Sequence, residues 1–294
     1  MDYKEDIFAG LEERRQYRGL KFVNEKIDKK IPSIDNREVH DSIFEDMGFK
    51  ESVFSECNFS HNTFINCYFK KVQMWDVNFT GSRFINCNFD EAEISHSSFI
   101  YCSFENCFIP YQAMVENLPT EANLRERLCR NLSIESLNSG NDKDYKMYFY
   151  DMKAAGEKNN FETFRIQRRP YYRKKTFDQR VSAFLAFVNS KVNKYLWGYG
   201  ENMGRLCFIL LCIVVGFAGL FFSPFSVIMD GYGNACEVSL GQTLYISIMN
   251  LCTTSAGYYA GNGMTKVFFG IENILGVLFF GLFVSVFVKN INRR

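Results

Sequence analysis

A short run of hydroxyl-bearing and small residues near the carboxyl end of the chain has the composition of a cation path. The run is Thr253, Thr254, Ser255, Ala256, Gly257, Tyr258 and Tyr259. The sequence on both sides is strongly apolar, and non-helical backbone among membrane helices is tolerated only where it lines a water-filled path. Selection between cations in such a path depends on the geometry and field strength of backbone carbonyl oxygens. The run is therefore a candidate lining for a water-filled path.

Three residues beyond this run are further candidates. Glu272 is the one charged residue between 267 and 288. An ionisable group in such a stretch is a functional candidate by default, and the alternative is a hydrogen-bonding brace for a neighbouring helix. Gly276 and Gly281 suit either gating hinges or close contacts between helices.

Catalytic and metal chemistry find little support in the sequence. The ten cysteines include no CxxC pair, and the three histidines are His40, His61 and His96. A zinc site needs tighter clustering than this. We find no nucleophile–base pair and no phosphate-binding loop. We therefore expect a protein that is not an enzyme, has no cofactor, and uses its cysteines as small apolar filler in a reducing compartment.

The elements around the candidate path are predicted from hydropathy and length. Residues 206–229 carry no charge, and 206–229 and 267–288 are each long enough to cross a bilayer, which takes about 20 apolar residues. Residues 239–252 are too short to cross and begin at Ser239, a good N-cap. The carboxyl end of this short helix, which is partially negative, favours cations. Residues 205–294 therefore form a predicted two-span membrane domain, with residues 253–259 following the short helix.

Charge predicts the orientation of this domain. Lys and Arg precede the first span and follow the second, and none lies between residues 206 and 265. Basic residues stay on the cytoplasmic side, so both termini are expected there, in a plasma (inner) membrane. Residues 110–204 are predicted to form a helical linker, in which residues 181–197 have the pattern of an amphipathic helix at the bilayer surface.

A five-residue repeat occupies residues 34–109. Every fifth residue from Ile34 to Ile109 is apolar, sixteen in all, and eleven of these are Phe. Residues two positions before them are small or slim, such as Cys67 and Cys87. Neither a helix nor a flat strand has a period of five, so the chain must turn a corner in each repeat.

These residues resemble the pentapeptide-repeat family. That resemblance implies a right-handed quadrilateral parallel β-helix of about four coils, with residues 1–33 as an N-terminal cap. Residues twenty apart should then stack in columns at about 4.8 Å, one containing Phe44, Phe64, Phe84 and Phe104, another Cys67, Cys87 and Cys107. The region holds twelve Asp/Glu against five Lys/Arg, and together with the downstream membrane domain it indicates no nucleic-acid partner.

Residues 205–294 resemble prokaryotic two-helix potassium-channel pores. The order of span, re-entrant pore helix (239–252), selectivity filter (253–259) and span carries the likeness. It implies a homotetramer that passes a monovalent cation, K⁺ by analogy. Two filter registers remain open. One aligns Gly257–Tyr258 with the family's Gly–Tyr and puts Tyr259 at the family's outer glycine; the other runs from Thr253 to Gly257 directly after the helix.

The fold expected overall is mixed: a β-solenoid, a helical linker and a helical pore domain. The function expected is that of a prokaryotic tetrameric cation channel with a cytosolic regulatory or assembly domain, whose partners are its own copies, the bilayer and a protein or small ligand on the solenoid. Two alternatives are a membrane-anchored interaction scaffold with a non-conducting pore and a signal-gated membrane-depolarising effector.

Overall fold

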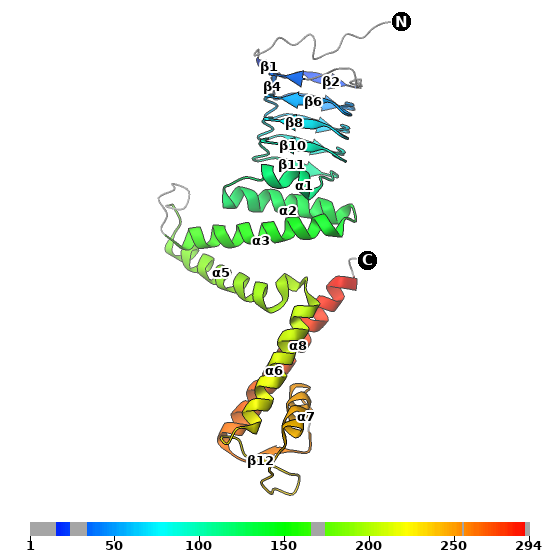
Figure 1. The fold of residues 1–294 in the computed structure, drawn as a ribbon. Helices are drawn as coiled ribbons and strands as arrows, with labels where there is room; N and C mark the ends of the chain where they lie inside the picture. Colours follow the sequence, from blue (N-terminus) through cyan, green and yellow to red (C-terminus); the bar gives the residue numbers. More distant parts are fainter. Residues whose placement is uncertain (1–15, 24–33, 166–173, 255, 292–294) are drawn as a thin grey trace. The chain divides into compact units, whose positions relative to one another are not determined.

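The computed structural model describes residues 16–23, 34–165, 174–254 and 256–291, and the chain divides into two compact units, Met1–Phe187 and Val188–Arg294. The first unit holds a parallel β-solenoid followed by helices, and the second holds two long helices with a short one between them (Figure 1). Most of the predicted N-terminal cap, residues 1–15 and 24–33, lies outside the described residues.

The solenoid is a stack of parallel coils. Two of its sides are sheets, with strand orders β10-β8-β6-β3 and β11-β9-β7-β5-β2, and the other two are rows of single parallel bridges. Successive coils pair twenty residues apart, as Phe44 does with Phe64 and Phe64 with Phe84. The coil is therefore four-sided, as the resemblance to pentapeptide repeats implies. Its strands are β3 (Ile34–Asp35), β4 (Glu38–His40), β5 (Ile43–Glu45), β6 (Val53–Ser55), β7 (Thr63–Ile65), β8 (Gln73–Trp75), β9 (Arg83–Ile85), β10 (Glu93–Ser95) and β11 (Ser103–Glu105).

The corners of the coil are made by residues in the left-handed backbone conformation. They lie two positions after the inward apolar residues, as Asp46 (φ 55°), Asn66 (φ 54°) and Gly81 (φ 75°) do. Asn, Asp and Gly tolerate this conformation best, and several corners use them. A left-handed residue every fifth position is what converts the sequence period into a closed coil.

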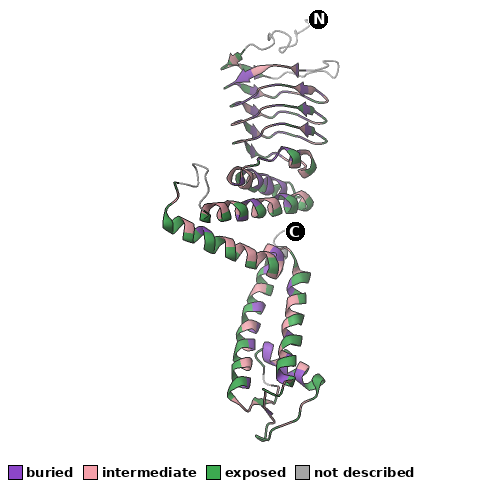
Figure 2. Ribbon diagram, turned by 60° about the vertical axis from the view of Figure 1, so that its left-hand side comes forward, coloured by how far each residue is buried: buried purple, intermediate pink, exposed green. Residues whose placement is uncertain are grey.

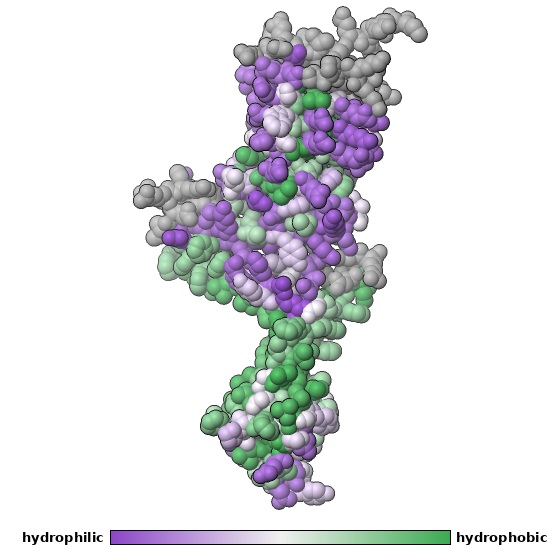
Figure 3. Space-filling model, viewed as in Figure 1, coloured by the Kyte–Doolittle hydropathy of each residue, from purple (hydrophilic) through white to green (hydrophobic). Residues whose placement is uncertain are grey.

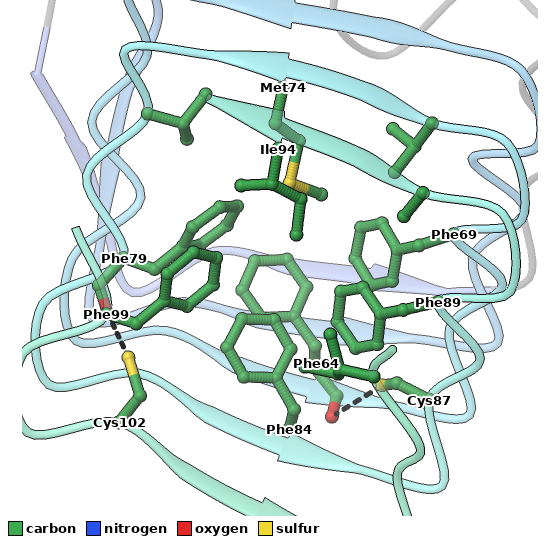
Figure 4. Close-up of a cluster of buried hydrophobic side chains, with 14 of the residues drawn as sticks. Phe64, Phe69, Met74, Phe79, Phe84, Cys87, Phe89, Ile94, Phe99 and Cys102 are labelled. Atoms are coloured by element: carbon green, nitrogen blue, oxygen red, sulfur yellow. Dashed lines mark hydrogen bonds between the residues drawn. The ribbon is translucent and has the colours of Figure 1, made fainter. Parts of the chain in front are cut away.

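Phenylalanine rings fill the centre of the coil (Figure 4). Phe44, Phe64, Phe84 and Phe104 form the predicted column, with ring centroids 4.7, 4.9 and 5.0 Å apart in nearly parallel planes. The cysteine column is also inward: Cys67, Cys87 and Cys107 are buried, and the Cys87 amide donates to the Cys107 sulfur at 3.2 Å. Stacked rings and buried apolar area hold successive coils together.

One coil begins before the predicted start at residue 34. Strand β2 (Lys21–Val23) pairs with β5, and β1 (Gln16–Arg18) pairs with β4. The Phe22 ring stacks on Phe44 at 4.7 Å. The offset of Phe22 from Phe44 is 22 residues rather than twenty, so this coil falls out of the five-residue period and the repeat pattern misses it.

Helices close the other end of the solenoid. They are α1 (Tyr111–Met114), η2 (Val115–Asn117), α2 (Ala122–Asn138) and α3 (Asp142–Phe164). The side-chain amide of Asn131 in α2 donates to the Phe104 carbonyl at 2.8 Å and accepts from the Phe104 amide at 2.7 Å. Asn117 does the same for the Ser97 amide and the Ile94 carbonyl. These amides occupy the positions of a further coil and satisfy what is otherwise an open sheet edge.

Helix α5 (Phe177–Trp197) has a largely exposed apolar side, consisting of Phe177, Val181, Phe184, Leu185, Val188, Val192 and Tyr195. Its Phe184 and Phe187 contact Phe164 and Phe161 of α3. The helix covers the predicted amphipathic residues 181–197. Its location at a bilayer surface stays a prediction.

The second unit contains α6 (Met203–Phe222), β12 (Ile228–Met229), α7 (Leu240–Leu251), β13 (Tyr259–Ala260) and α8 (Gly263–Ile291), after the short turn η3 (Gly198–Gly200). Met203–Phe222 and Gly263–Val288 are long and apolar enough to cross a membrane, with mean hydropathy of 2.5 and 2.2 over their best windows. Apolar residues cover the helices of this unit, whereas much of the solenoid surface is hydrophilic (Figure 3).

The first long helix ends earlier than predicted. Residues 223–229 are not helical, although the predicted span ran to 229. Ser223 is extended, as a residue before proline prefers, and Pro224 follows it. The hydroxyls of Ser223 and Ser226 both donate to the Leu220 carbonyl, at 2.6 and 2.8 Å, and so satisfy the end of the helix.

We predict that Phe84→Ala destabilises the solenoid by about 3–5 kcal/mol, because it removes a fully buried ring from the stack. Tyr101→Ala is the matched control: Tyr101 is 59% exposed, and the expected change is within about 0.5 kcal/mol. Urea unfolding, followed by Trp75 fluorescence in a Trp197→Phe background, measures both. Equal midpoints for the two variants would contradict the stacked core.

We also predict that three buried thiols of the first unit, those of Cys57, Cys102 and Cys129, resist alkylation in the folded protein. Burial raises the pKa of Cys57 to about 11 and the pKa of Cys102 and Cys129 to about 12. These groups then hold little of the reactive thiolate near neutral pH. Peptide mass mapping after maleimide treatment should find label on the loop residue Cys236, and on these three only after denaturation.

Candidate functional site

The short helix α7 has well-formed ends. Ser239 accepts a hydrogen bond from the Gln242 amide, and the Gln242 side chain accepts from the Ser239 amide in a capping box. At the other end the Thr253 amide donates to the Asn250 carbonyl at 2.8 Å and the Thr254 amide to the Met249 carbonyl at 2.9 Å. This pair of bonds is a Schellman motif, so the helix stops sharply at the start of the candidate segment.

Ending the helix at this point requires an unfavourable backbone conformation at Thr253. Its φ of 58° is in the left-handed region, which a β-branched residue rarely adopts. Such a conformation persists only where the surroundings hold it in place. The backbone direction after α7 is thus set by contacts that the helix makes elsewhere.

A buried polar network attaches α7 to both long helices. The Glu272 carboxyl group on α8 is fully buried and accepts hydrogen bonds from the Ser247 hydroxyl and, at 2.7 Å, from the Asn250 amide. Ser247 also lies 3.1 Å from the Val214 carbonyl of α6, and Asn250 donates to the Phe269 carbonyl at 3.1 Å. Of the two roles open for Glu272, these contacts are those of a brace. Among the described residues, the Glu272 carboxyl group forms no ion pair.

The two candidate glycines have different surroundings. Gly276 is buried where α8 crosses the carboxyl end of α7, and a Cβ atom there would collide with the backbone carbonyl of Leu251. Gly281 is exposed, and a Cβ atom there would meet nothing within 4 Å. Gly276 therefore permits close contact between α8 and α7, whereas Gly281 makes no such contact with the described residues. Buried residues of this unit are concentrated on and around α7 (Figure 2).

The candidate segment is partly packed and partly open. Thr253, Thr254 and Gly257 are exposed, while Ala256 and Tyr258 pack against a small core containing Phe221, Ile228 and Ile246. Gly257 has a φ of 77°, which L-residues with a side chain rarely adopt. Ser255 lies outside the described residues. Among its described residues, the segment thus has some packed against the protein and others exposed.

A second set of polar contacts fixes the far end of the segment. Strand β13, which contains Tyr259, pairs antiparallel with β12. The Asn262 side chain accepts from the Thr265 amide at 2.8 Å and donates to the Phe225 carbonyl at 2.9 Å. The buried Thr265 hydroxyl accepts from the Val227 amide at 2.9 Å. The start of α8 is thereby joined to the chain that follows α6.

Sequence reasoning proposed the segment, Glu272, Gly276 and Gly281 as candidates, and it did not include four hydrogen-bonding residues that the structure places beside them: Ser247, Asn250, Asn262 and Thr265. A signal for them exists, since they are hydrogen-bonding side chains within or beside apolar helices. Their partners are far away in the sequence, and that information is not in local spacing. The described residues contain no group of three or more His, Cys, Asp or Glu that could hold a metal ion.

We predict opposite effects for two matched substitutions. Gly276→Ala should destabilise the second unit by about 1–3 kcal/mol, because the added methyl group overlaps a backbone carbonyl. Gly281→Ala should leave stability unchanged or raise it, because alanine is the better helix former and the site is open. Thermal melting of the full chain in detergent measures both, and a melting temperature lowered equally by the two variants would contradict the contact.

Comparisons with known proteins bear on the first unit. A family model described as pentapeptide repeats, with eight copies, matches residues 73–108. No curated protein matches the sequence. Among solved structures, full-length QnrB1, titled a plasmid-mediated fluoroquinolone resistance protein, is similar at 20% identity over 33% of this chain and 45% of its own, with a TM-score of 0.19. A trypsin-treated form of QnrB1 is similar at 10% identity. The match covers 33% of this chain and 76% of the QnrB1 chain, with a TM-score of 0.14.

The chain thus spans less than half the length of full-length QnrB1. The residues of the family match form coils with the twenty-residue register, the left-handed corners and the Phe columns of this solenoid. The family match lies within the repeats of the first unit. Residues 73–108 of the solenoid are therefore pentapeptide repeats, and the coils that precede them from Ile34 onward continue them in the same twenty-residue register.

Proposed function

We propose that this chain is one subunit of a membrane cation channel, with residues 254–259, within the predicted segment 253–259, as its selectivity filter. The observation that carries the proposal is a short segment anchored at both ends between two helices of membrane-spanning length. Non-helical backbone at such a depth is stable only beside a water-filled path. A segment with some residues packed and others exposed meets that requirement.

The electrostatics of α7 favour a cation at the inner end of the segment. The carboxyl end of a helix carries a partial negative charge, and this end lies directly before Thr253. Thr253 and Thr254 are exposed there and supply hydroxyl oxygens. Neither Lys nor Arg occurs between residues 206 and 265, so no positive side chain from this part of the sequence opposes a cation.

The structure of the segment also bears on its register. Thr253 is used to terminate α7, so we start the filter at Thr254. Gly257 adopts the left-handed conformation, which suits the register that aligns Gly257–Tyr258 with the Gly–Tyr of potassium channels. Tyr259 then takes the place of the family's outer glycine, but it is extended in β13 and is not strained by its side chain.

Several copies must assemble to close a path, because one chain supplies one segment. The resemblance to potassium-channel-like pores makes four-fold cyclic symmetry our choice. Helix α8 has large exposed apolar residues, including Ile274, Val277 and Phe280, available for lipid or for other copies. The pentapeptide-repeat solenoid then serves as a cytosolic regulatory or assembly domain, with both termini on the cytoplasmic side of the membrane.

Ion flux in proteoliposomes tests the proposal. We expect the full chain to carry K⁺ down a gradient, and Gly257→Ala to abolish the flux, because alanine strains the backbone where φ is 77°. Gly216→Ala on α6 is the matched control: a Cβ atom there meets nothing within 4 Å and the position is helical, so flux should persist.

Other outcomes separate the alternatives. Equal Na⁺ and K⁺ flux retains the channel and removes potassium selectivity. Absence of flux in both gradients contradicts the channel and favours the membrane-anchored scaffold. Growth arrest on overexpression that Gly257→Ala relieves identifies a membrane-depolarising effector.

A further inference from the structure

The second unit contains a cavity of about 430 Å³, next to the start of the candidate segment, for which the proposed function names no occupant. It lies between α6 and α8, beneath the carboxyl end of α7. Its walls include Leu206 and Leu210 from α6, Leu251 from α7, and Phe279 and Phe283 from α8. This volume is within the range of sites that hold small molecules, about 300–1,000 Å³.

The lining excludes water as a favoured occupant. The only polar or polarisable lining groups besides backbone are the thiols of Cys207 and Cys252 and the hydroxyl of Thr253. A bound water needs two to four polar partners, and apolar cavities stay dry. An empty space of this size forfeits the dispersion contacts that a packed interior gains. An apolar molecule in the cavity would need no polar partners and would restore the missing dispersion contacts.

The opening of the cavity indicates where that occupant comes from. Val277 and Phe280 line it and are 62% and 72% exposed. They continue the exposed apolar surface of α8, one of the two helices long enough to span a bilayer. Around such a helix the abundant apolar molecules are lipid acyl chains. The lining residues carry no charge that would attract a headgroup.

We propose that this cavity is a lipid site that holds the acyl chain of a membrane phospholipid. The site rests on the membrane insertion of α6 and α8, which is one part of the proposed function, and is independent of ion conduction. An acyl chain there lies against Thr253 and Gly276. It therefore supports the point where α7 ends and the candidate filter begins.

Photolabelling locates the acyl chain. The full-length protein is reconstituted into phosphatidylcholine and phosphatidylglycerol vesicles containing a phosphatidylcholine with a diazirine on its acyl chain, irradiated, and mapped by peptide mass spectrometry. We expect label to concentrate on cavity residues, among them Leu210 and Phe283. Val277→Trp should remove that label by filling the opening, whereas Val284→Trp, on the exposed surface of α8 outside the cavity, should retain it.

The unsubstituted chain decides the question by itself if a variant fails to fold. Label spread evenly along the exposed residues of α6 and α8 would overturn the proposal. So would unlabelled cavity residues together with Cys207–Cys207 cross-links between chains, since a second copy would then cover the cavity. Flux measured in the same vesicles is a separate readout, so a labelled protein that carries no ion contradicts the channel and leaves the lipid site intact.

Discussion

The second unit is organised around one buried carboxyl group, that of Glu272. Burying such a group is costly unless hydrogen bonds replace its water. Ser247 and Asn250 of α7 provide those bonds, and Ser247 also reaches α6. The carboxyl group thereby fixes three helices against one another. Gly276, one turn further along α8, allows the carboxyl end of α7 to rest on the helix backbone.

The candidate segment depends on this arrangement. Thr253 holds a left-handed conformation because α7 is held in place before it, and Tyr259 is held by strand pairing and by the contacts of Asn262 and Thr265 beyond it. Between the two anchors, the described residues Thr254 and Gly257 are exposed. A functional segment is most accurately positioned when rigid elements and their supporting hydrogen bonds carry it.

The solenoid also needs hydrogen-bond partners where its regular structure ends. A parallel coil exposes unpaired backbone groups at each end of the stack. Asn117 and Asn131, which belong to the helical segments that follow the repeats, pair with these groups at one end through their side-chain amides. Along the stack, columns of Phe rings hold successive coils together. In both units, hydrogen bonds from a few polar side chains decide where a regular element stops.

The sequence alone determined the elements whose signal is local. The five-residue period predicted a chain that turns in each repeat, and the family resemblance added the column from Phe44 to Phe104. Apolar length predicted two spans, and Ser239 marked the start of α7. Only the tertiary structure separated Gly276 from Gly281, gave Glu272 its partners and revealed the coil formed by Phe22. These features depend on contacts between residues far apart in the chain, such as Ser247 with Glu272, 25 positions apart, and Val227 with Thr265, 38 apart. Periodicity and composition report a residue's own neighbourhood, and these partners meet only after the chain has folded.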